Sequence, residues 1–151
     1  MPEPKLRIFL DTNVIFSGLY SSQGAPGVIL KYFVEGRISI VVSQQILEEV
    51  IRTIKDKLPE ALPALKKFLV NAPPEVGGDP SPESIQRWAK EIHPADAAIL
   101  AAAIAAKPDY FITGDNDFLG NHIIMEKAGI NIMTPAQFLK LLEPGNHANL
   151  N

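Results

Sequence analysis

The stretch RIFLDTNV, residues 7–14, decides how the fold is interpreted. Its apolar run IFL does not alternate with polar residues, which is typical of a short strand buried on both faces. Such strands form parallel sheets in α/β proteins, whose ligands bind beyond the carboxyl ends of the strands. Because Asp11, Thr12 and Asn13 follow the strand directly, the sequence predicts a polar site at this end of the sheet.

The rest of the chain alternates between predicted strands and helices. Apolar runs predict further strands at 38–42, 110–113 and 130–133, with a short extended piece at 75–76 inside a loop over 72–82. Apolar periodicity and capping residues predict helices at 26–35, 43–57, 62–71, 81–88, 93–106, 117–127 and 134–142. This alternation favours an α/β protein with a parallel sheet.

Length and composition set the broad class of the protein. With 151 residues, 46% of them hydrophobic, the chain predicts one domain over 1–142, followed by a frayed tail at 143–151. There is no cysteine, which excludes disulfides and thiolate metal sites. The N-terminal MPEPK lacks the pattern of a signal peptide, and the apolar run 97–106 is too short to span a bilayer, so we expect a cytoplasmic protein without a membrane segment. A net charge of −3 gives no basic signature of nucleic-acid binding, but a metal ion can replace part of the missing positive charge.

Acidic residues from distant parts of the chain fall at predicted ends of strands and helices. Asp11 and Asp115 each follow a predicted strand, Asp96 lies in the first turn of a helix, and Glu48 and Glu49 lie on another helix. Carboxylates that converge repel each other unless a cation lies between them. Oxygen ligands without His or Cys suit Mg²⁺ or Mn²⁺, which can activate water and neutralise a phosphodiester.

Each acid taken alone also has a structural explanation. Asp11 fits a turn, Asp96 fits the positive end of a helix dipole, and Asp115 fits an N-cap. Glu48 and Glu49 flank the apolar stripe of their helix equally, so helical spacing does not choose between them. Only the combination of these positions indicates a site.

That combination resembles the PIN-domain family of nucleases, in particular the bacterial and archaeal branch described as toxins of toxin–antitoxin pairs. The resemblance covers about 7–142 and is carried by four motifs in order: LDTNV at 10–14, SQQILEEV at 43–50, DAAILA at 96–101 and TGDNDF at 113–118. In the second motif of the family, an acid follows the Ser by six positions, which favours Glu49 over Glu48.

The resemblance implies a three-layer α/β/α fold with a five-stranded parallel sheet. It implies that carboxylates bind Mg²⁺ or Mn²⁺ and cut RNA, with Asp11, Glu49, Asp96 and Asp115 as the catalytic metal ligands and Asp117 as a fifth member of the metal set. By the same resemblance, the hydrogen-bonding side chains that support the site are Thr12, Asn13 and Thr113. Relatives often carry more acids just before the third motif, where this chain has HPA at 93–95; the departure concerns a second, weaker metal position.

The family also implies an RNA substrate, an antitoxin protein as partner and a homodimer. The basic residues Arg52, Lys55 and Lys57 follow Glu49 on one helix. Such a run is usually a solvated face, and Arg52 and Lys55 are the candidates for contacts with RNA phosphates. Two alternative functions remain open from the sequence: a PIN-fold binding protein with weak or no catalysis, and a phosphatase with Asp11 as nucleophile. Against the phosphatase, the chain lacks the second Asp that haloacid-dehalogenase-like enzymes carry two residues after the nucleophile.

Overall fold

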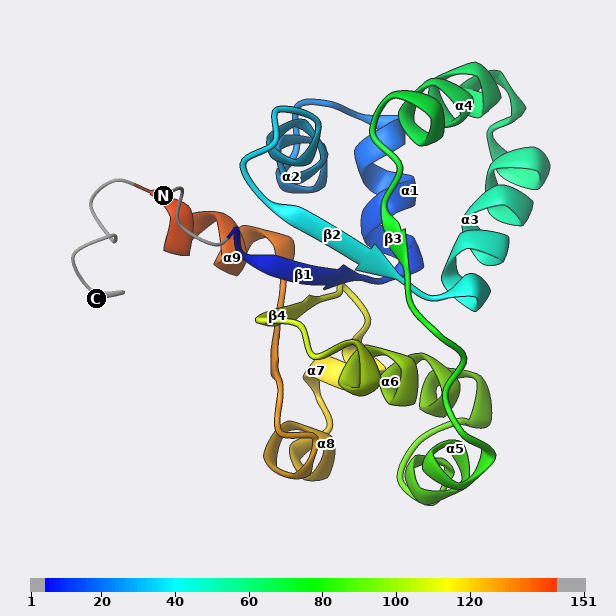
Figure 1. The fold of residues 1–151 in the computed structure, drawn as a ribbon, viewed down its shortest axis with the longest axis vertical. Coiled ribbons are helices and arrows are strands. Elements are labelled where there is room, and N and C mark those ends of the chain that lie inside the picture. The colour runs from blue at the N-terminus through cyan, green and yellow to red at the C-terminus, as the bar shows by residue number, and fades with distance from the viewer. Residues whose placement is uncertain (1–4, 144–151) are drawn as a thin grey trace.

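The computed structural model describes residues 5–143, which have an α/β fold around one five-stranded sheet (Figure 1). Glu143 is the C-cap of the last helix, and the rest of the predicted tail, 144–151, lies outside the described residues. The elements in chain order are β1 (Arg7–Leu10), α1 (Thr12–Tyr20), α2 (Ala25–Val34), β2 (Ser39–Val42), α3 (Gln44–Lys57), the short 3₁₀ helix η1 (Pro59–Ala61), α4 (Leu62–Asn71), β3 (Glu75–Val76), α5 (Pro82–Ala89), α6 (Pro94–Ala106), β4 (Tyr110–Ile112), α7 (Asn116–Leu119), α8 (His122–Lys127), β5 (Asn131–Met133) and α9 (Pro135–Leu142).

The five strands form one parallel sheet in the order β3-β2-β1-β4-β5. In register, Phe9 of β1 lies between Val41 of β2 and Phe111 of β4. The chain first builds outward from β1 to β3 and then returns to the other side of β1, so the strand order reverses between β1 and β4. Ligands of open α/β sheets bind at such a switch point, and the residues after β1 and β4 therefore lie in the expected place.

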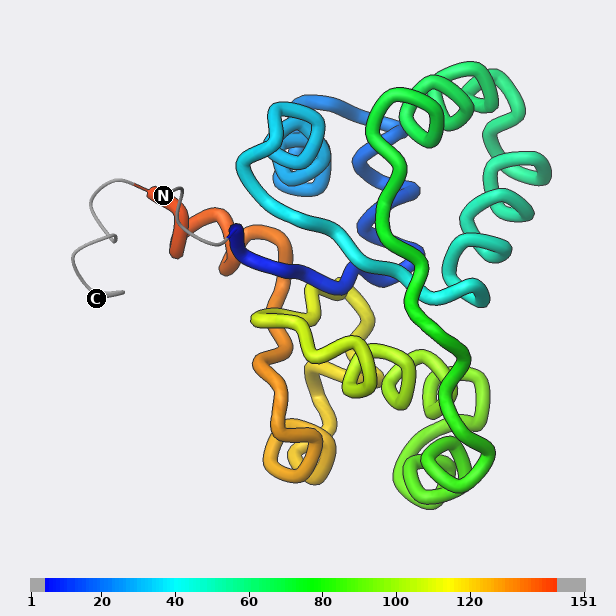
Figure 2. Tube along the Cα trace, in the orientation of Figure 1, coloured from blue at the N-terminus to red at the C-terminus, as the bar shows by residue number. Residues whose placement is uncertain are grey.

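Helices cover both faces of the sheet, which gives the three layers that the resemblance implies (Figure 1). The helices α1 to α4 lie on one side of the sheet and α5 to α8 on the other, while α9 packs against α2. Figure 2 shows how the segment between α4 and α5 passes along the sheet edge, where it contributes β3, from one helix layer to the other.

The core explains why the unalternating apolar runs become strands. Ile8, Phe9 and Leu10 are all fully buried, since helices cover both faces of β1. The rings of Phe9 and Phe118 each pack edge-on against Phe111, with centroids 5.4 and 5.1 Å from it. Burying a side chain of this size contributes about 2–3 kcal/mol. On the second face, the small side chains of α6 are buried against the rest of the core, as the alanine run predicts.

The structure differs from the sequence prediction at two helices. The residues directly after β1 form α1, which the turn-forming and polar residues of this segment did not predict; it is capped by Asp11 and buries Val14 and Ile15. The predicted helix at 117–127 is wrong, because two short helices, α7 and α8, replace it. The break falls at Gly120, after which the Asn121 side chain accepts a hydrogen bond from the backbone N–H of a new helix.

The other predicted elements agree with the structure to within a residue or two at their ends. Gly36 and Gly129 follow α2 and α8 with positive φ angles of 78° and 72°, which glycine adopts at little cost. Thr134 and Gln137 form the predicted capping box of α9. Between residues 5 and 143, no helix is both long enough and apolar enough to cross a bilayer.

Candidate metal-binding cleft

An open cleft of about 340 Å³ lies beyond the carboxyl ends of β1 and β4. Four of the predicted acids line it and come from four separate segments: Asp11 after β1, Glu49 on α3, Asp96 on α6 and Asp115 after β4. The remaining lining residues are Thr12, Asn13, Phe16, Thr53, Lys57, Ala95 and Ile99. The fold thus places the predicted acids around one cavity at the switch point of the sheet.

Asp11 is the most enclosed of these acids, with only 4% of its surface exposed. Its Oδ1 accepts the backbone N–H of Thr12 at 2.8 Å, which starts α1. Its Oδ2 accepts the hydroxyl of Thr113 at 2.7 Å and the amide of Asn13 at 3.2 Å. The turn and capping role that Asp11 alone suggests is therefore real, and the same geometry fixes the carboxylate at the floor of the cleft.

The three predicted supporting residues each connect two parts of the site. The Thr12 hydroxyl donates to Glu49 Oε2 at 2.8 Å and so ties α1 to α3. The Asn13 side chain donates to Asp11 and accepts the backbone N–H of Gly114 at 2.9 Å. The buried Thr113 hydroxyl accepts the backbone N–H of Asp115 at 2.9 Å while it donates to Asp11. Hydrogen bonds to charged groups of this kind hold the carboxylates in place.

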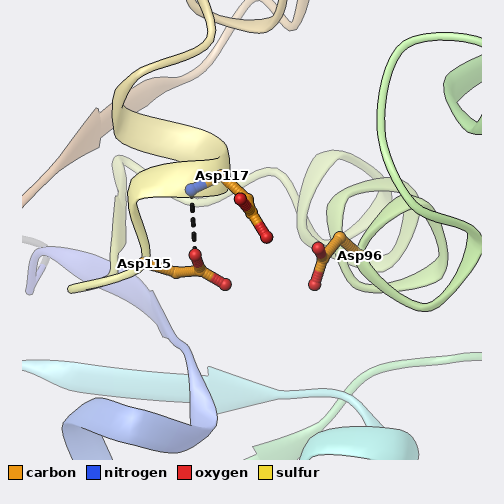
Figure 3. Close-up of side chains that lie close together, drawn as sticks. All are labelled: Asp96, Asp115 and Asp117. Atoms are coloured by element: carbon orange, nitrogen blue, oxygen red, sulfur yellow. Dashed lines mark hydrogen bonds between the residues drawn. The ribbon is translucent and has the colours of Figure 1, made fainter.

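Asp117 extends the acidic group toward the surface. One carboxylate oxygen each from Asp96, Asp115 and Asp117 lie within 4.8 Å of one another, and Figure 3 shows the three side chains converging from α6 and from the start of α7. Asp115 Oδ1 also accepts the backbone N–H of Asp117 at 2.9 Å, which makes Asp115 the N-cap of α7. Asp117 is exposed and lies outside the cleft lining, so it is a peripheral member of the group.

Burial and mutual repulsion disfavour the charged form of two of these acids. The pKa of Asp96 is raised from 3.8 to about 6, first by burial, then by the charges of Asp115, Asp117 and Asp11, with a smaller opposing effect of His93. Burial is also the main cause of the raised pKa of Asp11; its hydrogen bonds oppose this, and neighbouring acids add to it. An all-oxygen donor set with this excess of negative charge fits a hard divalent cation.

The cleft distinguishes residues that helical spacing left equivalent. Glu49 lines it and accepts a second hydrogen bond, from Gln45 at 3.1 Å, whereas Glu48 is exposed and outside the lining. Arg52 and Lys55 are exposed on α3 and also outside the lining.

Of the three basic residues that follow Glu49 on α3, Lys57 is the one that lines the cleft. Sequence reasoning missed two lining residues, Thr53 on α3 and Phe16 on α1. Their spacing of four residues, from Glu49 and from Thr12 respectively, is the sequence signal that could have found them.

Thr113 tests whether this network stabilises the fold. In Thr113→Val, Asp11 loses its shortest hydrogen bond and the Asp115 N–H loses its acceptor. We expect the free energy of unfolding in urea to fall by about 2 kcal/mol, which is the typical effect for a bond to a charged group. Thr113→Ser keeps the hydroxyl, so its free energy of unfolding should fall by less than half as much. Equal losses in both variants would contradict the assigned role of the hydroxyl.

The parallel sheet in the order β3-β2-β1-β4-β5, between two helix layers and with carboxylates converging at its switch point, defines a class of α/β protein with an acidic cleft. Comparison with protein families finds a match to the PIN domain over residues 7–117. The chain therefore belongs to the PIN domain family.

Solved structures with the same fold come from bacteria and an archaeon. VapBC2 from Rickettsia felis, solved bound to a DNA fragment from its promoter, superposes with a TM-score of 0.64 at 15% identity, covering 85% of this chain and 98% of that one. For FitAcB from Neisseria gonorrhoeae, the TM-score is 0.57 at 22% identity, with the same two coverages. PAE2754 from Pyrobaculum aerophilum superposes with a TM-score of 0.61 at 18% identity, covering 91% of this chain and 90% of that one. A search of curated proteins gives no significant match.

Proposed function

We propose that this PIN-domain protein is a Mg²⁺- or Mn²⁺-dependent endoribonuclease that hydrolyses RNA phosphodiesters. The observation that carries the proposal is the convergence of Asp11, Glu49, Asp96 and Asp115 on one open cleft. The pKa values of Asp11 and Asp96 are raised, first by burial and then by the neighbouring acids, so the fold holds their charges at a cost that a bound cation would relieve.

In this proposal, some side chains of the cleft bind the cation and others hold those ligands in position. Asp11, Asp96 and Asp115 are the ligands we assign to the cation, with Glu49 completing the set and Asp117 at its outer edge. A divalent cation bound there would activate a water and neutralise the phosphodiester. Thr12, Asn13 and Thr113 orient the carboxylates, since each hydroxyl or amide fixes a ligand before the substrate arrives. Arg52 and Lys55 are proposed contacts for RNA that extends beyond the cleft.

The partners we propose follow from the family and from the structural similarity to VapBC2 and FitAcB. In this proposal the protein is the toxin of a toxin–antitoxin pair, acts in the cytoplasm, is covered by an antitoxin protein and forms a homodimer.

The residue two positions after Asp11 disfavours the phosphatase alternative. Enzymes of the haloacid-dehalogenase type carry a second Asp there, whereas this chain has Asn13, whose side chain hydrogen-bonds Asp11 and the backbone N–H of Gly114. A binding protein without activity remains the competing function.

Cleavage of RNA by the purified protein separates nuclease from binding protein. A short fluorescent single-stranded RNA should be cut in millimolar Mg²⁺ or Mn²⁺ and left intact in chelator. A preparation that binds Mn²⁺ at these acids but leaves RNA intact would reject the nuclease.

Glu49 and Glu48 provide a matched pair for the metal site. Glu49 lies in the cleft and Glu48 on the exposed face of the same helix. We expect Glu49→Gln to weaken Mn²⁺ binding by about 10- to 100-fold, the range typical for residues around a metal site, and Glu48→Gln to leave it within twofold. Calorimetric titration with Mn²⁺ measures both. Equal effects, or the reverse order, would show that α3 contributes a different residue.

A further inference from the structure

Two walls of the acidic cleft come from opposite sides of the sheet. One carries Glu49 on α3 and the other carries Asp96 on α6, and these helices lie in different layers (Figure 1). Within residues 5–143, α3 and α6 share little direct packing. A cation held between Glu49 and Asp96 therefore needs another interaction to fix the distance from one wall to the other.

The side-chain amide of Gln45 connects these two walls. Gln45 lies four residues before Glu49 on α3, and its Nε2 donates to Glu49 Oε1 at 3.1 Å and to the backbone carbonyl of Ala95 at 3.2 Å. The Ala95 carbonyl belongs to the same peptide group as the backbone nitrogen of Asp96, so the second bond holds the start of α6. Gln45 thus restrains an acid on each wall, one directly and one through the backbone.

The chemistry of the two acceptors explains why a glutamine suits this position. A carboxylate oxygen and a carbonyl oxygen both need a donor, and the NH₂ group of Gln45 has one N–H for each. A glutamate here would offer only acceptors and would add charge to the acids. An asparagine is shorter by one methylene group, so it should not reach both acceptors from the same backbone position.

The adjacent residues of α3 form the same kind of pair without the connection to α6. Gln44 donates to Glu48 at 3.3 Å, again across four residues, and both side chains are exposed. Such a pair is common on helix surfaces and joins two residues of one helix. What distinguishes Gln45 is its bond to Ala95 in the opposite layer.

Gln45 also lies between two cavities. Glu49 and Ala95 line the acidic cleft, whereas Gln45 itself lines a neighbouring cavity of about 210 Å³, together with Ala98 of α6 and Asp79 of the segment before α5. Because this neighbouring space is not filled by side chains, α6 has room to shift there when the amide is removed. The spacing of the two walls therefore depends on the hydrogen bonds of Gln45 more than on close packing behind it.

We propose that Gln45 is a positioning residue that sets the spacing between Glu49 and Asp96 and thereby the affinity of the cleft for a divalent cation. The inference rests on the proposed metal site and adds a residue that is not one of its acids. Gln45 acts through Glu49 and through the first turn of α6, and is not itself a ligand. Loss of a group that holds a metal ligand in place typically weakens binding by about 10- to 100-fold.

Calorimetric titration with Mn²⁺ tests this role without RNA. Gln45→Met keeps the length of the side chain but removes both N–H groups, and we expect its Kd for Mn²⁺ to rise about 10-fold. Gln45→Asn keeps an amide that is too short for both partners, so its Kd should rise by a similar factor. Gln44→Met removes the exposed amide next to it and should stay within twofold of the parent. Thermal melts in chelator check that all three variants are folded.

A double-mutant cycle measures whether Gln45 acts through Glu49. In the Glu49→Gln background, Gln45→Met should raise the Kd for Mn²⁺ by less than about threefold, because the carboxylate that Gln45 holds is no longer there. In RNA cleavage, the Mn²⁺ concentration that gives half the maximal rate should rise about 10-fold in Gln45→Met, in line with its Kd. The rate at saturating Mn²⁺ should stay close to that of the parent, since the bound site is the same.

The outcomes separate this inference from the proposed function. If folded Gln45→Met binds Mn²⁺ as tightly as the parent, or Gln44→Met weakens binding equally, Gln45 is not a positioning residue and the nuclease proposal stands. Parent-like affinity in Gln45→Asn would also overturn the inference, because the reach to both walls would then not matter. Full additivity with Glu49→Gln would show that Gln45 does not act through Glu49.

The metal titration also decides the role of Gln45 when no activity is found. If the parent binds Mn²⁺ but leaves RNA intact, only the nuclease is rejected, and the Kd values of the Gln45 and Gln44 variants still confirm or overturn the inference. If the parent binds no Mn²⁺, both proposals fall.

Discussion

Asp11→Asn is expected to lower the rate of RNA cleavage in Mn²⁺ by about 10³-fold. The change keeps the size of the side chain and its capping of α1, because Asn is also a good N-cap, but it removes the negative charge at the floor of the cleft. An amide oxygen is a weaker ligand than a carboxylate, and losing one well-placed electrostatic group at a reacting centre typically costs 10²- to 10³-fold or more. Single-turnover cleavage of a fluorescent RNA measures the effect.

The matched control is Asp56→Asn, which removes the same charge from the exposed face of α3. Its rate should stay within twofold of the parent. A thermal melt of both variants in chelator shows whether they are folded. If folded Asp11→Asn cleaves RNA as fast as the parent, the carboxylate of Asp11 is not part of the catalytic site.

Asp96→Asn is expected to stabilise the metal-free protein at pH 8 and to reduce its gain from Mn²⁺. Because the pKa of Asp96 is raised from 3.8 to about 6 in the folded state, the protonated carboxyl favours folding. That stabilisation is complete below pH 3.8 and is lost as the pH rises through about 6, so at pH 8 the parent holds a charge that the fold disfavours. After discounting for solvent screening and for the favourable position of Asp96 at the start of α6, we expect about 1 kcal/mol in favour of the variant.

Thermal melts in chelator and in millimolar Mn²⁺ measure both parts of this prediction. In chelator at pH 8 the variant should melt about 2–5 °C above the parent, and the difference should narrow as the pH falls toward 4. Saturating Mn²⁺ should stabilise the parent by about 2–3 kcal/mol through mass action and the variant by clearly less. A variant that melts lower than the parent in chelator, or gains as much from Mn²⁺, would mean that Asp96 serves only the helix terminus.

Glu83→Gln is the control for the helix terminus. Glu83 lies in the first turn of α5, after a proline as Asp96 does, but it is exposed and outside the cleft. Its replacement should lower the melting temperature slightly or leave it unchanged, and the gain from Mn²⁺ should equal that of the parent. A pH-dependent stabilisation here would show that the effect of Asp96→Asn arises from any acid at a helix N-terminus.

The sequence by itself determined the elements whose signal is local. The run IFL at 8–10 predicts a strand buried on both faces, because neither side of it offers polar residues to water. Ser43 and Thr134 predict helix starts, because their hydroxyls satisfy backbone N–H groups within three residues. The four motifs at 10–14, 43–50, 96–101 and 113–118 were enough to suggest the family, since each is a short run of consecutive residues.

What only the tertiary structure decided depends on contacts between distant segments. Glu49 is distinguished geometrically from Glu48 by the hydrogen bond from Thr12, 37 residues away, and Thr113 reaches Asp11 across 102 residues. Helical periodicity does not predict such pairs, because it describes one face of one helix and carries no information about the helix that packs against that face. Lys57 and Phe16 enter the cleft for the same reason: each follows a site residue at helical spacing, but only the packing of α1 against α3 turns those two faces toward one cavity.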